Sequence, residues 1–391
     1  MLRVAFYAPL KPPDHPNPSG DRQIARLFIQ ALQQAGCQVE LASRLRSRDG
    51  KGDLLRQQRI GQVASGLARR LIRRYQRLPV AQRPQLWFTY HHYHKAPDWI
   101  GPQVADALNI PYVIAEASYS ARQHHGPWQH GLEGSIRGLR RADALLCLNP
   151  KDQPALRQLL GEQAPLHRFP PFLDLSPYLR LDTAAAPARQ LARQQLGEQW
   201  QIPADRPWLI TAAMMRPGDK QASYHLLAEA LRQLPDRPWQ LLVLGDGLAR
   251  TDIENDFRGL PVSWLGRQPP EALQPWLSAA DLFVWPAVNE AFGMALLEAQ
   301  ACGLAVIAGD EGGVASILAP EASQAVTPRD SQAFARAVAA ALDSDLHQRG
   351  LQARQHVLDH HGLPAASQQL QQLLSALVDK YASPAQAEGT E

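Results

Sequence analysis

Residues 281–303 read DLFVWPAVNEAFGMALLEAQACG and place a strand-like segment directly before a helical one. We expect the strand over residues 281–286 and a helix that is closed by a glycine. Glu290 should therefore lie in the strand-to-helix loop, and Glu298 near the end of the second helical turn. In an open parallel sheet, ligands bind outside the carboxyl ends of the strands. Unpaired backbone N–H groups at the helix start, around residues 292–295, would suit a phosphorylated ligand there.

This stretch also resembles a known family signature. The two glutamates, the FG between them, the EAxACG continuation and the later Gly312-Gly313 are similar to the E-x7-E region of glycosyltransferase family 4. Members of that family are retaining, nucleotide-sugar-dependent enzymes with the GT-B fold. The resemblance implies an α/β protein with two Rossmann-like, doubly wound parallel-sheet domains that face a deep interdomain cleft. It also implies that Glu290 holds donor-sugar hydroxyls and that Glu298 holds the nucleotide ribose. The backbone N–H groups that it assigns to sugar and phosphate are those of Phe292, Gly293 and Met294.

A second pair of charged residues follows the strand-like segment 208–215. Arg216 and Lys220 resemble the R-x4-K pair of the family, which grips the donor diphosphate. Cleavage of the bond between sugar and diphosphate develops negative charge on the leaving phosphate, and fixed cations can stabilise that charge without a metal. The alternative is two ordinary solvated cations in a loop. Their position at the carboxyl end of a strand favours the donor site.

Two glycines after strands match glycines that the family places near the nucleotide. Gly245 follows the apolar segment 239–244, and Gly266 follows 262–265. Most glycines after strands simply relieve backbone strain in a turn, so neither is specific. The resemblance is strong over about residues 206–320 and only architectural before them.

The amino-terminal half reads as a buried strand over residues 2–10 and a helix that begins near Asp21. No G-x-G-x-x-G lies between them, which excludes a nicotinamide-binding unit of the usual type. The family instead uses a longer loop with glycine near the helix start, close to the donor phosphate. Gly20 is the nearest match to that glycine. Ser19 or Asp21 could equally be no more than a helix cap.

The length and the alternating strand and helix patterns indicate two domains. A chain of 391 residues is too long for one typical core. We expect an acceptor-binding domain over residues 1–178 and a donor-binding domain over residues 179–365. Residues 366–391 should form a helix that crosses back to the first domain, as in GT-B enzymes, and a frayed tail. An alanine-rich, proline-bearing run at 183–187 fits the linker.

Composition adds expectations about location. No apolar run approaches the length of a membrane span, and the start lacks a secretory signal, so we expect a cytoplasmic protein. The three cysteines are isolated from one another, which gives no disulfide or metal spacing.

The charge is distributed unevenly along the chain. Residues 1–175 hold 24 Lys and Arg against 13 Asp and Glu, a net of +11, although the whole chain carries only +3. Within this half, Val63, Leu67, Leu71, Tyr75 and Leu78 recur at helical spacing among arginines. Such a helix could dock on anionic lipid at the inner face of the cytoplasmic membrane, or its apolar stripe could pack on the sheet. No aromatic-rich motif accompanies the arginines, so nucleic acid is not expected as a partner.

Histidines and aromatic residues gather after a strand in the same half. We expect His91, His92, Glu116 and His124 to converge at the carboxyl ends of the strands and to contact the acceptor. A histidine metal site is the alternative, but no zincin motif is present. Because GT-B transferases generally need no bound metal, we expect no metal and no cofactor besides the nucleotide-sugar substrate.

The resemblance implies a hexosyltransferase-type reaction. A sugar would pass from a nucleotide-diphosphate donor to a hydroxyl of a glycan or lipid-linked acceptor, with retention at the anomeric carbon. The catalytic candidates are Arg216, Lys220 and Glu290, and the process would be the synthesis of a cell-envelope polysaccharide, lipopolysaccharide or glycolipid. The alternatives are a nucleotide-sugar epimerase of the same fold and a noncatalytic GT-B scaffold subunit.

Overall fold

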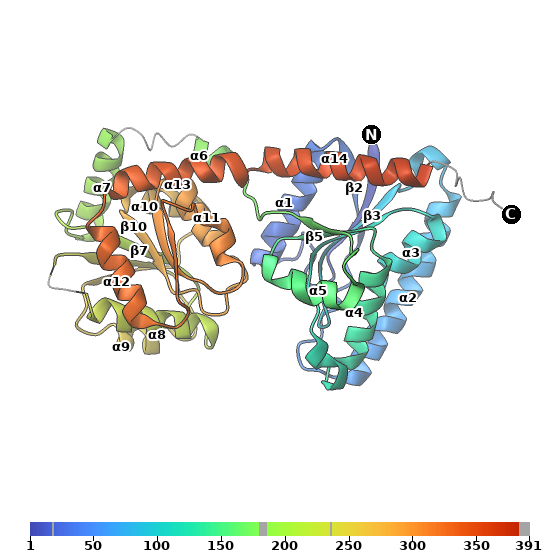
Figure 1. Cartoon of the computed structure of the whole chain (residues 1–391), viewed down its shortest axis with the longest axis horizontal. Coiled ribbons are helices and arrows are strands. Elements are labelled where there is room, and N and C mark those ends of the chain that lie inside the picture. Colours follow the sequence, from blue (N-terminus) through green and yellow to red (C-terminus); the bar gives the residue numbers. More distant parts are fainter. Residues whose placement is uncertain (18, 180–185, 235–236, 383–391) are drawn as a thin grey trace. The chain divides into compact units, whose positions relative to one another are not determined.

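The chain forms two compact units, which we describe separately. The structure, a computed structural model, describes residues 1–17, 19–179, 186–234 and 237–382. Unit 1 comprises Met1–Pro170 and Leu363–Glu391, and unit 2 comprises Pro171–Gly362 (Figure 1). The predicted linker residues 183–185 and the predicted tail beyond Ala382 lie outside the described residues.

Unit 1 is built on a six-stranded parallel sheet with the strand order β2-β1-β3-β4-β5-β6. Its strands are β1 Leu2–Tyr7, β2 Cys37–Ser43, β3 Leu86–His92, β4 Tyr112–Ala117, β5 Ala144–Cys147 and β6 Leu166–Arg168. The order reverses between β1 and β3. In doubly wound sheets, the loops that leave the carboxyl ends of the two strands at such a reversal form the ligand site.

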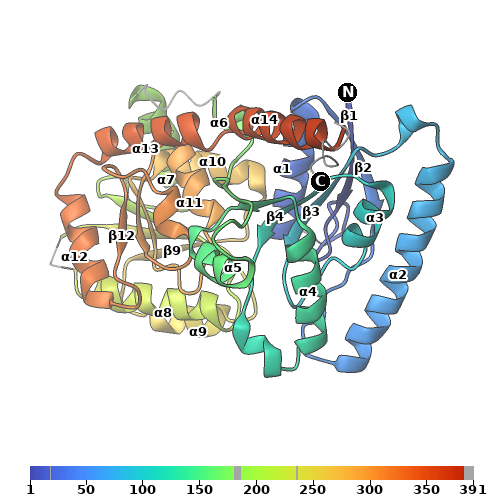
Figure 2. The same cartoon turned by 45° about the vertical axis from the view of Figure 1, so that its right-hand side comes forward.

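Helices cover both faces of this sheet (Figure 2). The α-helices of unit 1 are α1 Gly20–Gln34, α2 Leu54–Arg77, α3 Gly101–Leu108, α4 Gln129–Arg141, α5 Gln153–Leu160 and α14 Leu363–Ala382. The short 3-10 helices are η1 Val80–Gln82, η2 Ala121–His125 and η3 Pro150–Asp152. Helices α2, α3 and α4 contact one another, whereas α14 packs along α1. The Tyr381 hydroxyl at the end of α14 donates to Asp143 Oδ1 at 2.8 Å, which ties the helix to the rest of unit 1.

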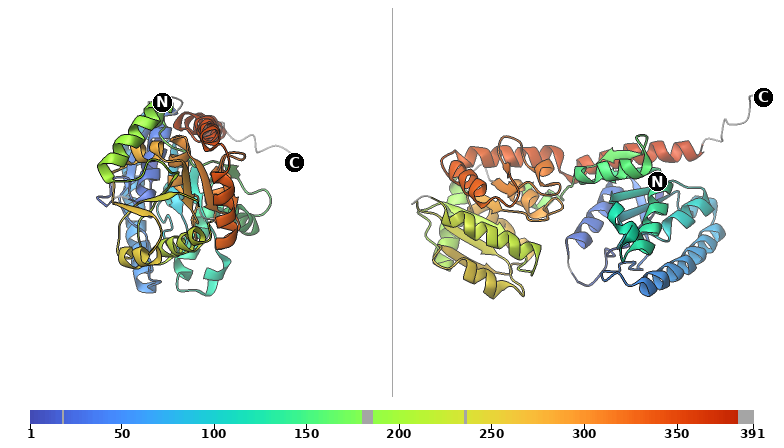
Figure 3. Two further views of the ribbon diagram at one scale, coloured as in Figure 1. Left: turned by 90° about the vertical axis from the view of Figure 1, so that its left-hand side faces the viewer. Right: turned by 60° about the horizontal axis from the view of Figure 1, so that its bottom comes forward.

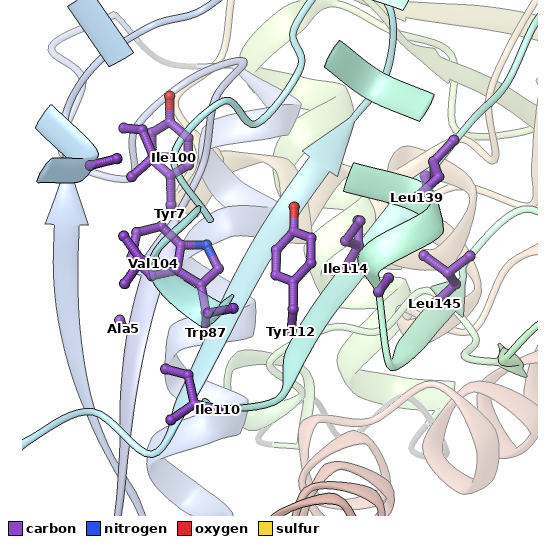
Figure 4. Close-up of a cluster of buried hydrophobic side chains, with 14 of the residues drawn as sticks. Ala5, Tyr7, Trp87, Ile100, Val104, Ile110, Tyr112, Ile114, Leu139 and Leu145 are labelled. Atoms are coloured by element: carbon purple, nitrogen blue, oxygen red, sulfur yellow. The ribbon is translucent and has the colours of Figure 1, made fainter. Parts of the chain in front are cut away.

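The core of unit 1 contains large aromatic and aliphatic side chains around Tyr7, Trp87 and Tyr112 (Figure 4). The apolar stripe of α2 belongs to this core, because Ala64, Ala68, Leu71 and Tyr75 are buried in it. Burial of such a stripe removes apolar area from water and stabilises the helix in place. Of the predicted stripe, Leu71 and Tyr75 are buried, and Leu67 and Leu78 pack against the core partly buried, whereas Val63 is 48% exposed. The structure thus shows core packing for most of the stripe, with the arginines exposed.

Unit 2 repeats the same kind of architecture with the strand order β12-β11-β10-β7-β8-β9 (Figure 3). Its strands are β7 Trp208–Ala212, β8 Gln240–Leu244, β9 Val262–Gly266, β10 Leu282–Trp285, β11 Ala305–Gly309 and β12 Gln324–Val326. All neighbouring strands are parallel, and the order reverses between β7 and β10. The predicted α/β architecture of doubly wound parallel sheets is therefore confirmed in each unit.

Helices connect the successive strands of unit 2, as parallel pairing requires, and further helices precede β7 and follow β12. The helices of unit 2 are α6 Ser176–Leu179, α7 Ala186–Trp200, α8 Asp219–Arg232, α9 Arg250–Asp256, α10 Pro270–Ala279, α11 Met294–Ala301, η4 Val314–Ile317, α12 Ser331–Leu342 and α13 Leu346–His360. In the described part of the chain, we find no helix with the length and apolar character needed to cross a membrane. Cys37, Cys147 and Cys302 are buried free thiols.

Candidate active site

The strand order of unit 2 brings the two predicted donor segments together. β7 and β10 are neighbours, with Leu282 paired to Leu209 and Phe283 to Ile210. The loop after β7 carries Arg216 and leads into α8, whose second residue is Lys220. The loop after β10 carries Glu290. Both loops therefore leave the carboxyl edge at the reversal of strand order, where an α/β sheet binds its ligand.

Lys220 and Glu290 meet directly. Lys220 Nζ forms an ion pair and hydrogen bond with Glu290 Oε2, and both side chains are largely buried. The Trp285 indole Nε1 donates to the same carboxylate oxygen at 3.4 Å. Lys220 Nζ also lies 5.3 Å from the centroid of the Trp285 ring, within cation–π range. These contacts join a cation that can bind phosphate to a carboxylate that can bind sugar hydroxyls.

The loop that carries Glu290 is held in an unusual backbone conformation. Ala287 and Asn289 have positive φ angles of 56° and 52°, which are costly for residues other than glycine. Side chains from two directions support them. The Asn289 amide Nδ2 donates to Asp219 Oδ2 at 2.9 Å, and the Asn289 backbone N–H donates to Glu311 Oε2 at 2.7 Å. The Val288 backbone N–H donates to Ser223 Oγ at 3.0 Å, which fixes the loop against α8.

Two glycines, Gly293 and Gly312, allow the backbone to pack closely around the loop that carries Glu290. Gly312 has a φ of +55°, and a Cβ there would collide with the carbonyl oxygen of Glu290. Gly293, with a φ of +73°, precedes α11 without a side-chain cap. Only glycine adopts such angles without strain. The Gly312 position therefore lets the loop after β11 press against the backbone of Glu290.

Helix α11 begins at Met294, two residues later than the first of the predicted N–H donors. The Leu296 N–H donates to Gly293 O at 2.9 Å, and Phe292 is a buried side chain. Glu298 is the fifth residue of α11 and is half-buried. Burial and then the Glu298 carboxylate raise the pKa of the Tyr178 hydroxyl, so Tyr178 lies close to Glu298.

Arg216 forms no hydrogen bond or ion pair with Glu290. Its side chain is exposed, and among the described residues it forms no hydrogen bond or ion pair; its backbone N–H donates to Met214 O at 3.1 Å. The guanidinium is thus available to a ligand. Its role in gripping a diphosphate stays a prediction.

Gly245 and Gly266 help to join three loops of unit 2. The Gly245 N–H donates to Gly266 O at 2.9 Å, and the Met215 N–H donates to Asp246 O at 3.0 Å. A Cβ at Gly245 would collide with the carbonyl oxygen of Ala213. The absence of a side chain therefore lets the loop after β8 lie against the loop that carries Arg216. Their contact with a nucleotide stays a prediction.

In unit 1, the reversal of strand order brings together a second group of charged side chains. His91 Nδ1 lies 3.2 Å from Asp21 Oδ1 and 3.8 Å from Glu116 Oε1. His91 and Glu116 have positive φ angles of 62° and 59° at the ends of β3 and β4. Such strain, at about 1–3 kcal/mol per residue, persists where the surroundings impose it and is common at functional sites. We call Asp21, His91, Glu116 and Asp152 the acidic-histidine cluster.

Electrostatics link the members of this cluster. Burial lowers the pKa of His91, but the carboxylates of Glu116, Asp21 and Asp152 outweigh it and raise that pKa overall. Burial and the Glu116 carboxylate raise the pKa of Asp152 to about 6. The Tyr90 hydroxyl and Glu116 Oε2 are buried, and neither has a hydrogen-bond partner of good geometry among the described residues. The carboxylates of the cluster therefore favour the protonated form of the His91 ring, and the Tyr90 hydroxyl and Glu116 Oε2 interact without a well-aligned hydrogen bond.

The other predicted residues of unit 1 are not members of this cluster. His92 is fully buried, its Nε2 lies 3.0 Å from Ser135 O, and its Nδ1 accepts the Asp98 N–H, so neither ring nitrogen is left for an acceptor. His124 lies in η2, where its Nε2 is 2.9 Å from the Tyr119 hydroxyl. Gly20 is the first residue of α1 and is exposed, and the hydroxyl of Ser19 caps that helix.

The sequence does not assign Asp152 or Trp285 to a site, and it offers Asp21 only as a helix cap, whereas Tyr90 belongs to the aromatic and histidine cluster that it predicts. One signal was available for Trp285, since it is the last residue of β10 before the Glu290 loop. In the described ranges, no three His, Cys, Asp or Glu side chains are arranged to hold a metal ion. A pocket of about 560 Å³ lies along α8 and α9, lined among others by Gln221, His225 and Asp256, and it includes none of the predicted site residues.

The acidic-histidine cluster predicts a pH dependence of stability. Asp152 ionises at about pH 6 in the folded protein against 3.8 ordinarily, so its charge increasingly destabilises the fold as pH rises through this interval. The raised pKa of His91 changes stability in the same direction. Protonation of His91 stabilises the fold fully below its ordinary pKa of 6.5, and this contribution is lost as pH rises above its pKa in the folded protein. We expect Asp152→Asn to raise the thermal midpoint at pH 8 by several degrees and to flatten its slope between pH 4 and pH 7.

Differential scanning fluorimetry across that pH range measures the effect. Glu162→Gln, which removes an exposed carboxylate of the same unit, is the matched control and should leave the pH profile unchanged. An Asp152→Asn profile that is parallel to the wild type would contradict the assignment.

Comparison with known proteins adds an independent line of evidence. Residues 206–344 match the family described as Glycosyl transferases group 1. The chain is 26% identical to D-inositol 3-phosphate glycosyltransferase of Xylanimonas cellulosilytica over an alignment of 326 residues. This alignment covers 77% of this chain and 73% of that protein. The chain is also 26% identical to the putative teichuronic acid biosynthesis glycosyltransferase TuaC of Bacillus subtilis, over 60% of this chain and 56% of the relative. The chain thus spans little more than half the length of some of these relatives.

Solved structures with the same architecture cover nearly the whole chain. Anabaena Alr3699/HepE in complex with UDP aligns with a TM-score of 0.72 at 17% identity, over 96% of this chain and 100% of that chain. Sucrose-phosphate synthase from Thermosynechococcus elongatus aligns with a TM-score of 0.70 at 20% identity, over 97% and 100%. These alignments show the GT-B fold. Together with the sequence matches, they support a glycosyltransferase.

Proposed function

We propose that this chain transfers a sugar from a nucleoside-diphosphate donor to a hydroxyl acceptor, with retention at the anomeric carbon. The observation that carries the proposal is the contact between Lys220 and Glu290 at the reversal of strand order in unit 2. Both residues lie within the segment that matches group 1 glycosyl transferases. The bound UDP of the Anabaena structure supports a nucleotide-sugar donor for the same fold.

Binding of the donor would break the ion pair between Lys220 and Glu290 and give each of the two residues a contact with the donor. A diphosphate competes with Glu290 for Lys220, because its two phosphates together carry two negative charges against one on the carboxylate. Glu290 is then released to accept hydrogen bonds from sugar hydroxyls, while Trp285 still donates to it. Exposed Arg216 offers a planar fork to two further phosphate oxygens. Glu298 would accept hydrogen bonds from the ribose hydroxyls.

The reaction that we propose breaks the bond between the anomeric carbon and the phosphate oxygen. The acceptor oxygen forms the new bond on the same face, and its proton passes to the departing phosphate oxygen. The charge that develops on the diphosphate is stabilised by Lys220 and Arg216. This route needs no protein nucleophile, so neither Glu290 nor Glu298 has to attack carbon.

The acidic-histidine cluster of unit 1 would bind the acceptor. Carboxylates accept hydrogen bonds from hydroxyl groups, and protonated His91 donates them. The buried Tyr90 hydroxyl and Glu116 Oε2 have bonding capacity that a polyhydroxylated acceptor can use. We include His91, Glu116 and Asp21 in this role, and not His92, because both of its ring nitrogens are engaged.

One experiment tests the function. The purified protein is screened by thermal shift against UDP-, GDP- and ADP-linked sugars, and the best donor is incubated with hydroxyl acceptors before the anomeric configuration of the product is determined. We expect a stabilising donor and a product with the configuration of the donor. An altered sugar still attached to the nucleotide would indicate an epimerase, and donor binding without turnover would favour a scaffold. Inversion at the anomeric carbon would overturn the retaining mechanism.

We also propose peripheral contact with an anionic membrane through α2. The outward arginines Arg69, Arg70, Arg73 and Arg77 are exposed, and each cation near an anionic surface contributes about 1 kcal/mol. At the start of the same helix, Leu54 and Leu55 are 52% and 77% exposed. Apart from the exposed Val63, the apolar stripe packs on the core, so attraction would depend mainly on the arginines and these two leucines. Such contact would suit a lipid-linked acceptor of cell-envelope synthesis at the cytoplasmic face.

Flotation with vesicles measures this contact. We expect wild-type protein to float with phosphatidylglycerol-containing vesicles at low salt, and to be released at high salt because surface charges are screened. Replacing Leu54 and Leu55 with serine should reduce the floating fraction severalfold. Val80→Ser, which changes an exposed apolar residue outside α2, is the control. Equal absence of wild-type protein from the vesicles at both salt concentrations would refute the membrane proposal.

A further inference from the structure

Trp285 touches both charged members of the donor site. Its indole N–H donates to Glu290 Oε2 at 3.4 Å, and its ring lies 5.3 Å from Lys220 Nζ. It is 4% exposed at the end of β10, so its ring has little freedom to turn. The Trp285 side chain thus contacts the Glu290 carboxylate with the edge of its ring and the Lys220 ammonium group with the face of its ring.

A second aromatic residue fixes the orientation of Trp285. The Tyr224 ring packs edge-on against it, with centroids 5.1 Å apart and an interplanar angle of 77°. The Tyr224 hydroxyl donates to Ala213 O at 2.8 Å, in the loop that precedes Arg216. Tyr224 therefore connects the loop after β7 to the loop after β10. Perpendicular aromatic pairs of this kind are favourable beyond their buried area.

We propose that Trp285 is a positioning residue. It holds Glu290 where this carboxylate can bind the sugar, and Lys220 where this ammonium group can bind the diphosphate, of the same donor molecule. When the diphosphate takes Lys220 from Glu290, the indole N–H remains to aim the carboxylate at the sugar. The ring face keeps the ammonium group beside the phosphate. This inference rests on the proposed transfer reaction. It assigns to Trp285 the joint positioning of the residue that binds the donor sugar and the residue that binds the donor diphosphate.

Two substitutions separate these two actions. Trp285→Phe keeps an aromatic face near Lys220 but removes the N–H, so we expect KM for the nucleotide sugar to rise about tenfold. That factor corresponds to about 1.4 kcal/mol, close to the lower end of what a hydrogen bond to a charged group contributes. Affinity for the free nucleoside diphosphate should change less than twofold. Trp285→Leu removes both the N–H and the face, and should weaken binding of the free diphosphate as well.

The measurements are steady-state kinetics with the best donor and isothermal titration calorimetry with its free nucleoside diphosphate. Trp276→Phe is the matched control: Trp276 is buried in the same unit against Trp200 and Trp208, without a contact to Lys220 or Glu290. Trp276→Phe should lower stability and change the affinities for the nucleotide sugar and the free diphosphate by similar factors, if at all. Substitution of Trp285 would give the same result if Trp285 had only a structural role.

The outcomes distinguish the two proposals. If the wild type transfers sugar and Trp285→Phe shows the donor KM of the wild type, the positioning role is overturned and the function stands. If Trp285→Phe weakens the free diphosphate as much as the nucleotide sugar, the separate actions of edge and face are overturned. If the wild type transfers no sugar from any donor of the panel, the proposed function fails, and the role of Trp285 fails with it.

Discussion

Replacing Lys220 with alanine should lower the turnover number by a factor of about 10²–10³, the range for loss of one fixed group that stabilises transition-state charge. Lys220 is the only lysine between residues 171 and 362, so no other ammonium group of unit 2 can replace it. Because the charge on the diphosphate grows as the sugar departs, the loss should appear in kcat more than in KM. Steady-state kinetics with a saturating donor measure both constants.

The fold should survive this substitution. The Lys220 side chain is 28% exposed and is the second residue of α8, where alanine is a good helix former. Arg258→Ala, which removes an exposed cation from the same unit, should leave kcat within a factor of two. A Lys220→Ala enzyme with wild-type turnover would remove the main support for the proposed mechanism.

The largest expected effect on stability comes from Asp98 in unit 1. This carboxylate is buried, and its Oδ1 accepts the backbone N–H groups of Ile100 and Gly101, each at 2.8 Å. Its Oδ2 accepts the Trp87 indole at 3.1 Å, the Thr89 hydroxyl at 2.6 Å and the Tyr112 hydroxyl at 3.1 Å. Alanine would leave five buried donors without this acceptor, at about 1–3 kcal/mol for each one that stays unsatisfied.

We therefore expect Asp98→Ala to destabilise unit 1 by more than about 3 kcal/mol. Hydrogen exchange of unit 1 amides, combined with urea unfolding, measures the loss and locates it. The matched control is Asp106→Ala, since Asp106 is an exposed carboxylate of the same unit paired with Arg141, and surface ion pairs contribute about 0–1 kcal/mol. Equal effects of the two substitutions would show that the buried network is not needed.

The sequence was sufficient for the parts of the fold that depend on local pattern. Alternating apolar strands and helices predict parallel sheets, and the strands expected around Trp208, Gln240 and Leu282 form close to the expected bounds. The contact between Lys220 and Glu290 needs more than pattern, since seventy positions separate them. It depends on β7 and β10 becoming neighbours, which is a property of sheet order and of long-range packing.

In unit 1, local pattern could not distinguish functional from structural side chains. His91 and His92 are adjacent and chemically identical, but the positive φ of His91 turns it toward Asp21 and Glu116, whereas His92 enters the network of Asp98. Asp152 resembles an ordinary acidic residue before a helix, and only burial beside Glu116 makes it unusual. The amphipathic pattern of α2 suits a membrane or a core equally well, and packing decides between them.

The discontinuous composition of unit 1 has a consequence for biosynthesis. Helix α14, whose Leu370 and Leu374 are buried, lies along α1 but is encoded after the whole of unit 2. The ribosome delivers residues 1–170 and then the contiguous residues 171–362 before it delivers α14, and domains generally fold as they emerge. Unit 2 can therefore be complete while α1 still exposes the apolar surface that α14 will cover. During synthesis, the second half of this protein should reach its native structure before the first half does.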